Sequence, residues 1–477
     1  MKILLVTFDR DPDVIPLGLA YIAGFLEHRG IDVRLVDAGR LGLSEDRILD
    51  IIAEERFRMV GMSVATHFHP AALRFFSRVK ALNPEIVTVA GGPHPTALPE
   101  ESVRSPVLDY AVLGEGEKTV EELARCIERG DDPEGVAGIA FNRGGNFVKT
   151  GSRSYIQNLD SLPFPLWRQL PVHLYRFPHL PRKNHVRIMA ARGCPYNCAF
   201  CAASCLWGRR MRWRSPGNVV SEIELLENEF GVHSISFADS TFTADRDWVM
   251  DFCRCLIERN IDVGWMANAR GDCIDSELVG TMKEAGCKAI SVGVESGDPR
   301  ILKNMRKGET VEQIRRAFHI IRNAGLISRG CFILGYPGES IESIENTIRF
   351  AVELNPSHPA SCSYATPYPG SELYQIALRE NGIRTGWEDF THFNSAIRHS
   401  RVLPYVPEGL TENDLISARR RFIRRVMLGK LIRLRAYRDF MSGFIHPLFY
   451  LIGDKFRKTR SAYRARRDSS FARGKNV

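Results

Sequence analysis

Short apolar runs alternate with amphipathic stretches through the first third of the chain. The strand-like runs occupy 3–8, 33–37, 59–64 and 86–90, and helix-like stretches with apolar residues three and four positions apart occupy 19–29 and 71–82. Strands that alternate with helical segments of this length predict βαβ units and a parallel sheet. We therefore expect residues 1–140 to form a doubly wound α/β domain that binds ligands outside the carboxyl ends of its strands.

A second alternation of strands and helices begins near residue 186. Its strand-like runs lie near 187–191, 234–237, 263–267, 289–295, 330–334 and 361–366, after a segment rich in proline and aromatic residues. Six such units predict a partial (βα)6 barrel over residues 186–400, with its active site at the C-terminal ends of the strands. Residues 141–185 are then a linker, and residues 401–477 form a helical basic extension.

Composition is that of a folded globular protein, with 44% hydrophobic and 25% charged residues. The first residues are too short an apolar run for a signal peptide, and no run approaches the ~20 apolar residues needed to span a bilayer. These features predict a cytoplasmic protein. In a reducing cytosol its eleven cysteines stay free of disulfides.

The net charge of +9 belongs to the C-terminal tail. Residues 419–477 hold 18 Lys and Arg against 3 Asp and Glu, whereas the rest of the chain holds 47 against 53. Because the body is mildly acidic, we expect no nucleic-acid partner there. Within the tail, residues 415–436 mix apolar and basic positions, and 444–452 form an aromatic and aliphatic patch. Three interpretations stay open: a peripheral contact with anionic lipid at the inner face of the membrane, a helical cap over the barrel, or an RNA contact.

One cluster of cysteines has the spacing of a metal site. Cys194, Cys198 and Cys201 follow the first barrel strand in a CxxxCxxC loop, where three thiolates can bind three irons of a 4Fe–4S cube. The fourth iron would stay open to a small chelating ligand. Structural zinc sites use a second, distant cysteine pair, which the chain lacks. Three structural cysteines are the alternative, and Cys205 is either a fourth ligand or, as we favour, a bystander.

Together with the motifs after it, this loop resembles the radical S-adenosylmethionine (SAM) superfamily from about residue 187 to about 378. The resemblance implies that the open iron chelates SAM, whose cleavage makes a 5′-deoxyadenosyl radical. It also implies that a set of residues at the strand ends binds SAM: Phe200, Asp239, Arg270, Glu295, Ser296, Ile333 and Gly335. The motif at 366–371 resembles the end of the sixth strand in this subgroup. One departure is Ser240, which stands where relatives carry a second acid after Asp239.

The N-terminal domain resembles the Rossmann-like cobalamin-binding domain that precedes many radical SAM enzymes. Ile15 takes the place of the cobalt-ligating histidine in the first motif, so no imidazole ligand is expected from it. A hydroxyl at Ser63 can bind a buried nucleotide tail, and two glycines let the backbone approach a large planar ring. The residues expected at cobalamin are Ile15, Gly18, Ser63, Gly91, Gly92, His94, Gly114 and Glu115. His94 and His67 could approach the cofactor, and a Rossmann-like fold with another ligand is the alternative.

These resemblances imply a cobalamin-dependent radical SAM enzyme, similar to anaerobic tetrapyrrole cyclase-like and lipid-modifying members. The expected reaction is methylation of an unactivated carbon in a hydrophobic substrate, such as a lipid, a polyprenoid or a tetrapyrrole. An external reductant of the flavodoxin or ferredoxin type would supply single electrons. The alternatives are an oxidative cyclase or rearrangement enzyme, and a non-catalytic iron–sulfur or cobalamin sensor.

Overall fold

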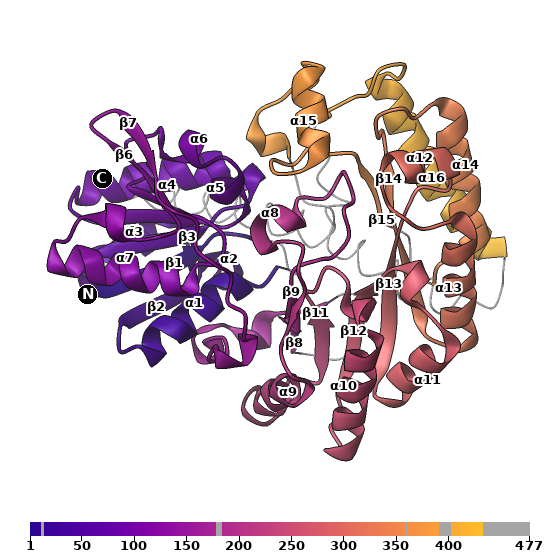
Figure 1. The fold of residues 1–477 in the computed structure, drawn as a ribbon, viewed down its shortest axis with the longest axis horizontal. Helices are drawn as coiled ribbons and strands as arrows, with labels where there is room; N and C mark the ends of the chain where they lie inside the picture. Colours follow the sequence, from indigo (N-terminus) through magenta and orange to yellow (C-terminus); the bar gives the residue numbers. More distant parts are fainter. Residues whose placement is uncertain (11–13, 178–183, 358–360, 391–401, 433–477) are drawn as a thin grey trace, which may run out of the picture.

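The computed structural model describes residues 1–477 except for 11–13, 178–183, 358–360, 391–401 and 433–477. Two α/β units lie side by side, and the short helix α8 (Ala203–Trp207) lies between them (Figure 1). The first unit is the predicted doubly wound domain, and the second is a curved half barrel.

The N-terminal sheet has seven strands in the order β2-β1-β3-β4-β5-β6-β7. β1 to β5 are parallel, while β6 and β7 form an antiparallel hairpin at one edge. The strands are β1 (Lys2–Thr7), β2 (Asp32–Asp37), β3 (Met59–Ser63), β4 (Val87–Gly91), β5 (Tyr110–Val112), β6 (Ile139–Arg143) and β7 (Asn146–Lys149). The hairpin runs past residue 140, so this sheet extends into the predicted linker.

Helices cover both faces of this sheet. They are α1 (Leu17–His28), α2 (Ala38–Leu41), α3 (Glu45–Glu55), α4 (His69–Leu82), α5 (Pro93–Ala97), α6 (Pro99–Val103) and α7 (Glu117–Arg129). Apolar residues of α1 and α7 share one core, and those of α3 and α4 share another. Because each face buries its own apolar layer, the strands are apolar on both sides, as a parallel sheet requires.

The barrel sheet has six parallel strands in the order β15-β14-β13-β12-β11-β8, which confirms the predicted half barrel. The strands are β8 (His185–Ile188), β11 (Ser234–Phe237), β12 (Gly264–Ala269), β13 (Cys287–Glu295), β14 (Ile327–Leu334) and β15 (Ser361–Tyr364). The helices are α9 (Pro216–Phe230), α10 (Arg246–Glu258), α11 (Ser276–Glu284), α12 (Pro299–Asn304), α13 (Val311–Asn323), α14 (Ile341–Leu354) and α15 (Glu372–Arg379). A separate pair, β9 (Ala191–Arg192) and β10 (Arg212–Trp213), brackets the cysteine loop.

The described part of the basic extension packs on the barrel. Helix α16 (Glu412–Ile432) lies beside α14 and buries Leu415, Ala418, Phe422 and Val426. The Phe422 ring meets the Phe332 ring of β14 at a centroid distance of 5.0 Å. Helix α16 therefore caps the barrel through its apolar face. The apolar patch 444–452 lies outside the described residues.

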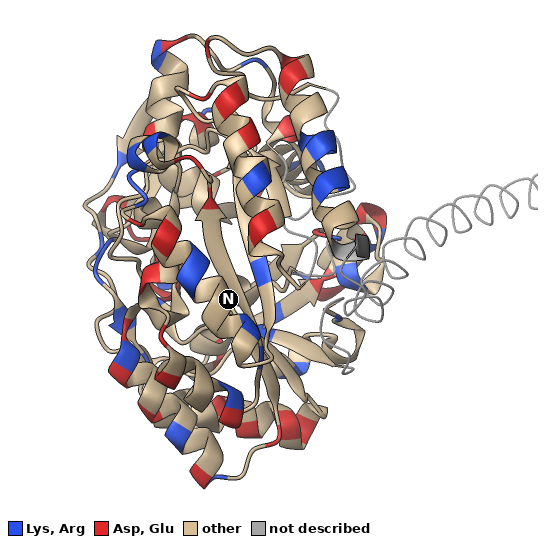
Figure 2. Ribbon diagram, turned by 90° about the vertical axis from the view of Figure 1, so that its right-hand side faces the viewer, with Lys and Arg blue, Asp and Glu red and all other residues tan. Residues whose placement is uncertain are grey.

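Buried ion pairs join the two units. Glu115 and Glu117, which follow β5, pair with Arg192 of β9, and Glu115 also pairs with Arg212 of β10. All four side chains are at most 4% exposed. On the surface, by contrast, residues of both charge signs are interspersed along the helices (Figure 2). Since a buried charge needs a partner, these contacts hold the N-terminal domain against the start of the cysteine loop.

Candidate active site

The cysteine loop begins directly after β9. Gly193 has a φ of +101°, and a Cβ there would lie 2.2 Å from the Arg210 carbonyl oxygen, so only glycine fits this turn. The Cys201 amide donates to the Cys198 carbonyl at 3.1 Å, which closes a second turn. Cys194, Cys198 and Cys201 are free and partly buried.

The three thiols lie in a low-dielectric setting with positive charge nearby. Burial raises the pKa of Cys198 to about 11, while the charges of Lys307 and Arg270 act to lower it. Burial also raises the pKa of Cys201, and a charge on Cys194 adds to this, so the two sulfurs lie within electrostatic reach. Metal ligation requires thiolates, which iron itself stabilises. Three adjacent thiols beside buried cations therefore fit a 4Fe–4S cluster.

Cys205 lies apart from this set on α8. A Cβ on Gly370 would be 2.8 Å from its sulfur and 3.5 Å from the Cβ of Ala97 in α5. The side chain therefore packs where α8 meets the N-terminal domain and the motif after β15.

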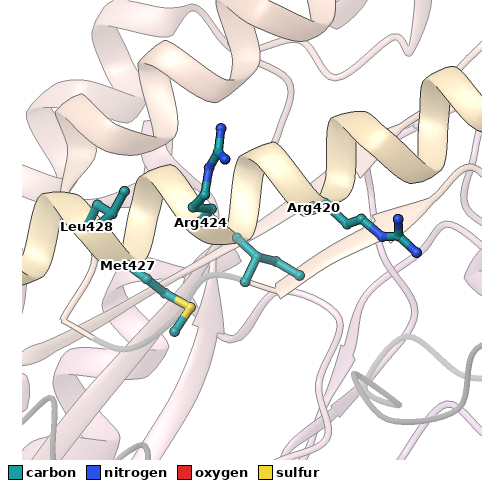
Figure 3. Close-up of a pocket in the computed structure, with 5 residues that line it drawn as sticks. Arg420, Arg424, Met427 and Leu428 are labelled. Atoms are coloured by element: carbon teal, nitrogen blue, oxygen red, sulfur yellow. The ribbon is translucent and has the colours of Figure 1, made fainter.

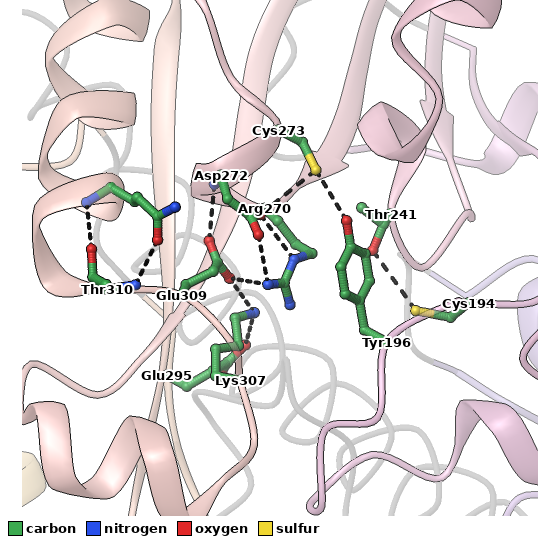
Figure 4. A network of polar contacts seen from close by, with 11 residues as sticks. Cys194, Tyr196, Thr241, Arg270, Asp272, Cys273, Glu295, Lys307, Glu309 and Thr310 are labelled. Atoms are coloured by element: carbon green, nitrogen blue, oxygen red, sulfur yellow. Dashed lines mark hydrogen bonds and ion pairs between the residues drawn. The ribbon is translucent and has the colours of Figure 1, made fainter.

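A network of polar side chains connects the cysteine loop to the ends of β12 and β13 (Figure 4). Arg270 lies over the Tyr196 ring of the loop at 3.7 Å and pairs with Asp272. Glu309 binds both Arg270 at 3.5 Å and Lys307 at 3.2 Å. Lys307 in turn reaches Glu295 at 3.3 Å.

Sequence reasoning missed Tyr196, Lys307 and Glu309 in this network. Tyr196 lies inside the cysteine motif, where an aromatic ring could have been noted. Lys307 and Glu309 follow α12 in a charged loop, and no spacing in the sequence indicates that they are buried. Their burial comes from the approach of this loop to the strand ends.

Two of the predicted SAM residues share an apolar cluster. Phe200 packs against the cluster that contains Ile333 and Tyr336. Gly335 follows with a φ of +84°, and its amide donates to Glu339 at 2.5 Å, which shapes the turn after β14. Phe200 and Ile333 offer an apolar wall near the strand end, which suits an adenine ring.

Asp239 and Ser296 are engaged by the protein. The Asp239 carboxylate accepts from the amides of Ala190 and Ala191 at 3.1 and 2.5 Å, and burial raises its pKa to about 7. The Ser296 hydroxyl lies 3.0 Å from the Thr347 hydroxyl of α14. Their contacts with SAM, like that of Arg270, stay predictions.

The predicted cobalamin residues gather at the carboxyl edge of the first sheet. Ser63 and Gly91 are in register on β3 and β4, and a Cβ on Gly92 would lie 2.8 Å from the Ser63 hydroxyl. A Cβ on Gly18 or on Gly114 would meet no atom within 4 Å. Ile15 is buried. This edge has the close-approach glycines and the open backbone that a large planar ring needs.

His94 is the most unusual group at this edge. It is fully buried, yet neither ring nitrogen has a hydrogen-bond partner in the described part of the chain. Its ring stacks on His69 at 4.0 Å and meets Trp387 at 5.4 Å. Burial and then the His69 charge lower the pKa of His94 to about 3. A neutral imidazole with unused nitrogens can serve a bound ligand, so the edge fits cobalamin. The ligand atoms of His94, His69 and Glu101 lie within 4.8 Å of one another.

Fold and site thus define a two-domain α/β protein in which a three-cysteine loop meets a ligand-binding sheet edge. Residues 188–351 match the family model of the radical SAM superfamily, and residues 3–124 match that of the B12 binding domain. The site residues predicted for SAM and cobalamin all lie within or beside these ranges.

An uncharacterized methyltransferase of Pyrococcus horikoshii is 34% identical, over 80% of this chain and 83% of the relative. The anaerobic magnesium-protoporphyrin IX monomethyl ester cyclase of Rubrivivax gelatinosus is 33% identical, over 87% and 74%. The fold resembles that of the radical SAM methyltransferase TsrM from Kitasatospora setae, with a TM-score of 0.71, 20% identity and coverage of 90% and 96%. The chain belongs to the radical SAM superfamily, in the cobalamin-binding group that includes methyltransferases. It is a radical SAM enzyme whose cofactors are a 4Fe–4S cluster, SAM and cobalamin. Within the described ranges, no helix is long and apolar enough to cross a bilayer.

Proposed function

We propose that this enzyme transfers a methyl group to an unactivated carbon of a hydrophobic substrate, such as a lipid, a polyprenoid or a tetrapyrrole. The observation that carries the proposal is the contact between α8, which follows the cluster cysteines, and α5, which follows Gly91 and Gly92. This contact would bring the two proposed cofactor sites to one interface. The relative at 34% identity is an uncharacterized methyltransferase, which supports the transfer of a methyl group.

When bound, the reduced cluster and SAM supply the radical that removes hydrogen, and cobalamin carries the methyl group. The protein's own residues hold and orient these groups. Cys194, Cys198 and Cys201 would bind the iron, and Phe200 and Ile333 would offer an apolar wall to the adenine. Ser63, Gly91, Gly92 and the neutral His94 would cradle cobalamin, and the buried ion pairs of Arg192 would hold the two sites in a fixed relative position.

An oxidative cyclase or rearrangement enzyme is the second candidate, and the cyclase relative at 33% identity favours it. A non-catalytic sensor is the third. Anaerobic, reconstituted enzyme should release 5′-deoxyadenosine on reduction, which a sensor would not do. Incubation with extracts of cells lacking the protein should then yield a product heavier by one CH2 group. A product that has lost hydrogen and gained no carbon would show that the enzyme cyclises its substrate instead of methylating it.

Reduction of the cluster needs an external donor, for which we propose a flavodoxin- or ferredoxin-type protein. We also propose a peripheral membrane contact through the outer face of α16. A pocket on this helix is lined by Arg420, Ile423, Arg424, Met427 and Leu428 (Figure 3). Arg421 and Arg425 are bound to Glu345, whereas Arg420 and Arg424 have no carboxylate within ion-pair distance among the described residues. Cations beside exposed apolar side chains suit an anionic lipid surface.

A further inference from the structure

Two histidines and a glutamate meet beside the predicted cobalamin edge of the first sheet. His69 begins α4, which follows β3, and His94 lies in α5, which follows β4. Glu101 lies in α6, directly after α5. One ligand atom from each of the three side chains lies within 4.8 Å of the others. Of the three, only His94 is among the residues expected at cobalamin.

Backbone contacts hold the elements that carry these side chains. The His94 amide donates to the Val64 carbonyl at 3.1 Å, and the Val64 amide donates to the Gly91 carbonyl at 2.8 Å. These bonds tie the segment after β4 to the segment after β3, which leads into α4 through η1 (Thr66–Phe68). The Leu98 amide donates to the His94 carbonyl at 2.9 Å, just before α6 begins. The three elements are therefore positioned by main-chain bonds that do not use the three side chains.

His94 has the capacity to bind a further ligand. Its side chain is fully buried, and neither Nδ1 nor Nε2 has a hydrogen-bond partner among the described residues. His69 is also buried, and its ring lies against the His94 ring at a centroid distance of 4.0 Å. Buried imidazoles are neutral, so each keeps a lone pair that a metal ion can use. A buried polar atom without a partner destabilises a fold unless a ligand meets it.

Glu101 is oriented by a side chain that follows the barrel in sequence. The Trp387 indole N–H donates to the Glu101 carboxylate, and the same indole lies 5.4 Å from the His94 ring. Trp387 belongs to η8 (Trp387–Asp389), which packs against η1 and α4. A carboxylate that binds a metal is typically held by such a second hydrogen bond, and its other lone pairs stay available. The indole therefore lies against the trio and fixes its acidic member.

We propose that His69, His94 and Glu101 bind one divalent transition-metal ion of the zinc type, separate from the cluster iron and from the cobalt of cobalamin. Zinc accepts imidazole and carboxylate ligands at about 2.0–2.2 Å and leaves a fourth position for water. Ligand atoms around a tetrahedral zinc lie about 3.4 Å apart, so no pair has to close by more than about 1.4 Å from the 4.8 Å limit. A metal on one nitrogen of His94 leaves the other for cobalamin.

The ion would clamp the segments after β3 and β4 to each other. Through Glu101 and Trp387 it would also tie them to the segment after α15. This inference goes beyond the proposed function, since it requires neither methyl transfer nor SAM cleavage.

The test measures zinc on the anaerobic full-length holoenzyme, with cluster and cobalamin in place, by calorimetry and by elemental analysis after gel filtration. Zinc chloride is the probe, and magnesium chloride is the control because Mg²⁺ prefers oxygen ligands. Wild type should retain about one zinc per chain and no magnesium. His94→Leu should retain none, and Glu101→Gln should bind zinc at least about tenfold more weakly. His319→Gln, at an exposed position of α13, is the matched control and should behave as wild type.

Urea unfolding gives a second readout and shows whether the variants fold. Because neither nitrogen of His94 has a partner in the described part of the chain, His94→Leu should keep its midpoint when zinc is absent. Zinc should raise the midpoint of wild type and of His319→Gln, but not that of His94→Leu.

Wild type that retains no zinc, or that binds magnesium as tightly as zinc, would overturn the inference. Zinc retained at the wild-type level by both His94→Leu and Glu101→Gln would place the ion elsewhere and would also overturn it. If His94→Leu does not fold, Glu101→Gln decides alone: weaker zinc binding supports the site, and unchanged binding rejects it.

Discussion

The buried carboxylates that join the two domains provide the sharpest test of the fold. Glu115 accepts from Arg192 at 3.1 Å, from Arg212 at 2.6 Å and from the Ile156 amide at 2.6 Å. The Glu115→Gln substitution keeps the shape of the side chain but removes the negative charge that faces two buried guanidinium groups. Breaking a buried pair in this way costs about 3–5 kcal/mol, because a desolvated charge loses its partner. The cost of Glu117→Gln should lie at the lower end of this range, since Arg192 then still pairs with Glu115.

The matched control is Glu122→Gln on α7, whose carboxylate is half exposed and pairs with Arg153. Exposed pairs contribute only about 0–1 kcal/mol, so this variant should stay close to wild type. The assay is urea unfolding of anaerobic protein, followed by tryptophan fluorescence, together with iron content per chain. Glu115→Gln should lower the midpoint, separate the unfolding of the two domains and reduce iron, because Arg192 directly precedes the cysteine loop. If Glu115→Gln were as stable as Glu122→Gln and retained full iron, the domain-joining role would be refuted.

Four further outcomes are expected. Alanine at Cys194, Cys198 or Cys201 should abolish cluster assembly and SAM cleavage, whereas Cys205→Ala should retain about four irons by iron and sulfide analysis; loss of the cluster in Cys205→Ala would contradict the open-iron site. Paramagnetic resonance of the cobalt(II) form should show no nitrogen splitting from a protein histidine, because Ile15 stands in the place of the ligating histidine and His94 is fully buried; such splitting, or no cobalamin binding, would contradict the assignment. Burial, reinforced by the Arg187 charge, lowers the pKa of His185 to about 3. Between that value and about 6.5, the pKa of an unperturbed histidine, the unfolded chain binds one more proton than the folded chain, so the free energy of unfolding decreases as the pH falls. Going from pH 7 to pH 5 should cost about 2 kcal/mol at this residue, and His185→Gln should make the pH slope of urea unfolding shallower; an unchanged slope would count against the assignment. Finally, the protein should float with anionic liposomes at low salt, and Arg420→Gln with Arg424→Gln should weaken this while Arg254→Gln does not; flotation that ignores lipid charge would reject the contact.

Much of the architecture could be predicted from periodicity and spacing. Apolar runs of strand length, separated by amphipathic stretches, indicated both parallel sheets, and the observed strands differ from the predicted ones by a few residues at most ends. The β6–β7 hairpin was missed because β7 is only four residues long and largely exposed, while the five-residue β6 buries three consecutive residues and so shows no apolar alternation. The cysteine loop could be found because its ligands are close in sequence, so local spacing alone describes the site.

Contacts between distant segments could not be predicted in the same way. Glu115 was expected at cobalamin, and its pairing with Arg192 and Arg212 depends on how two domains pack, which no local pattern encodes. Its contact with cobalamin stays a prediction.

The amino-acid sequence alone was enough to determine the two α/β units, the cysteine loop and the glycines that let backbone approach a ligand, because these depend on local conformation and short spacing. Only the tertiary structure decided which charges are buried together. Lys307 joins Glu295 through a loop that folds back on the strand ends, and Glu115 meets Arg192 and Arg212 where the two domains pack together. The physical reason is that a buried charge is tolerated only where distant strands and loops bring its partner or its ligand, and that arrangement exists only in the folded chain.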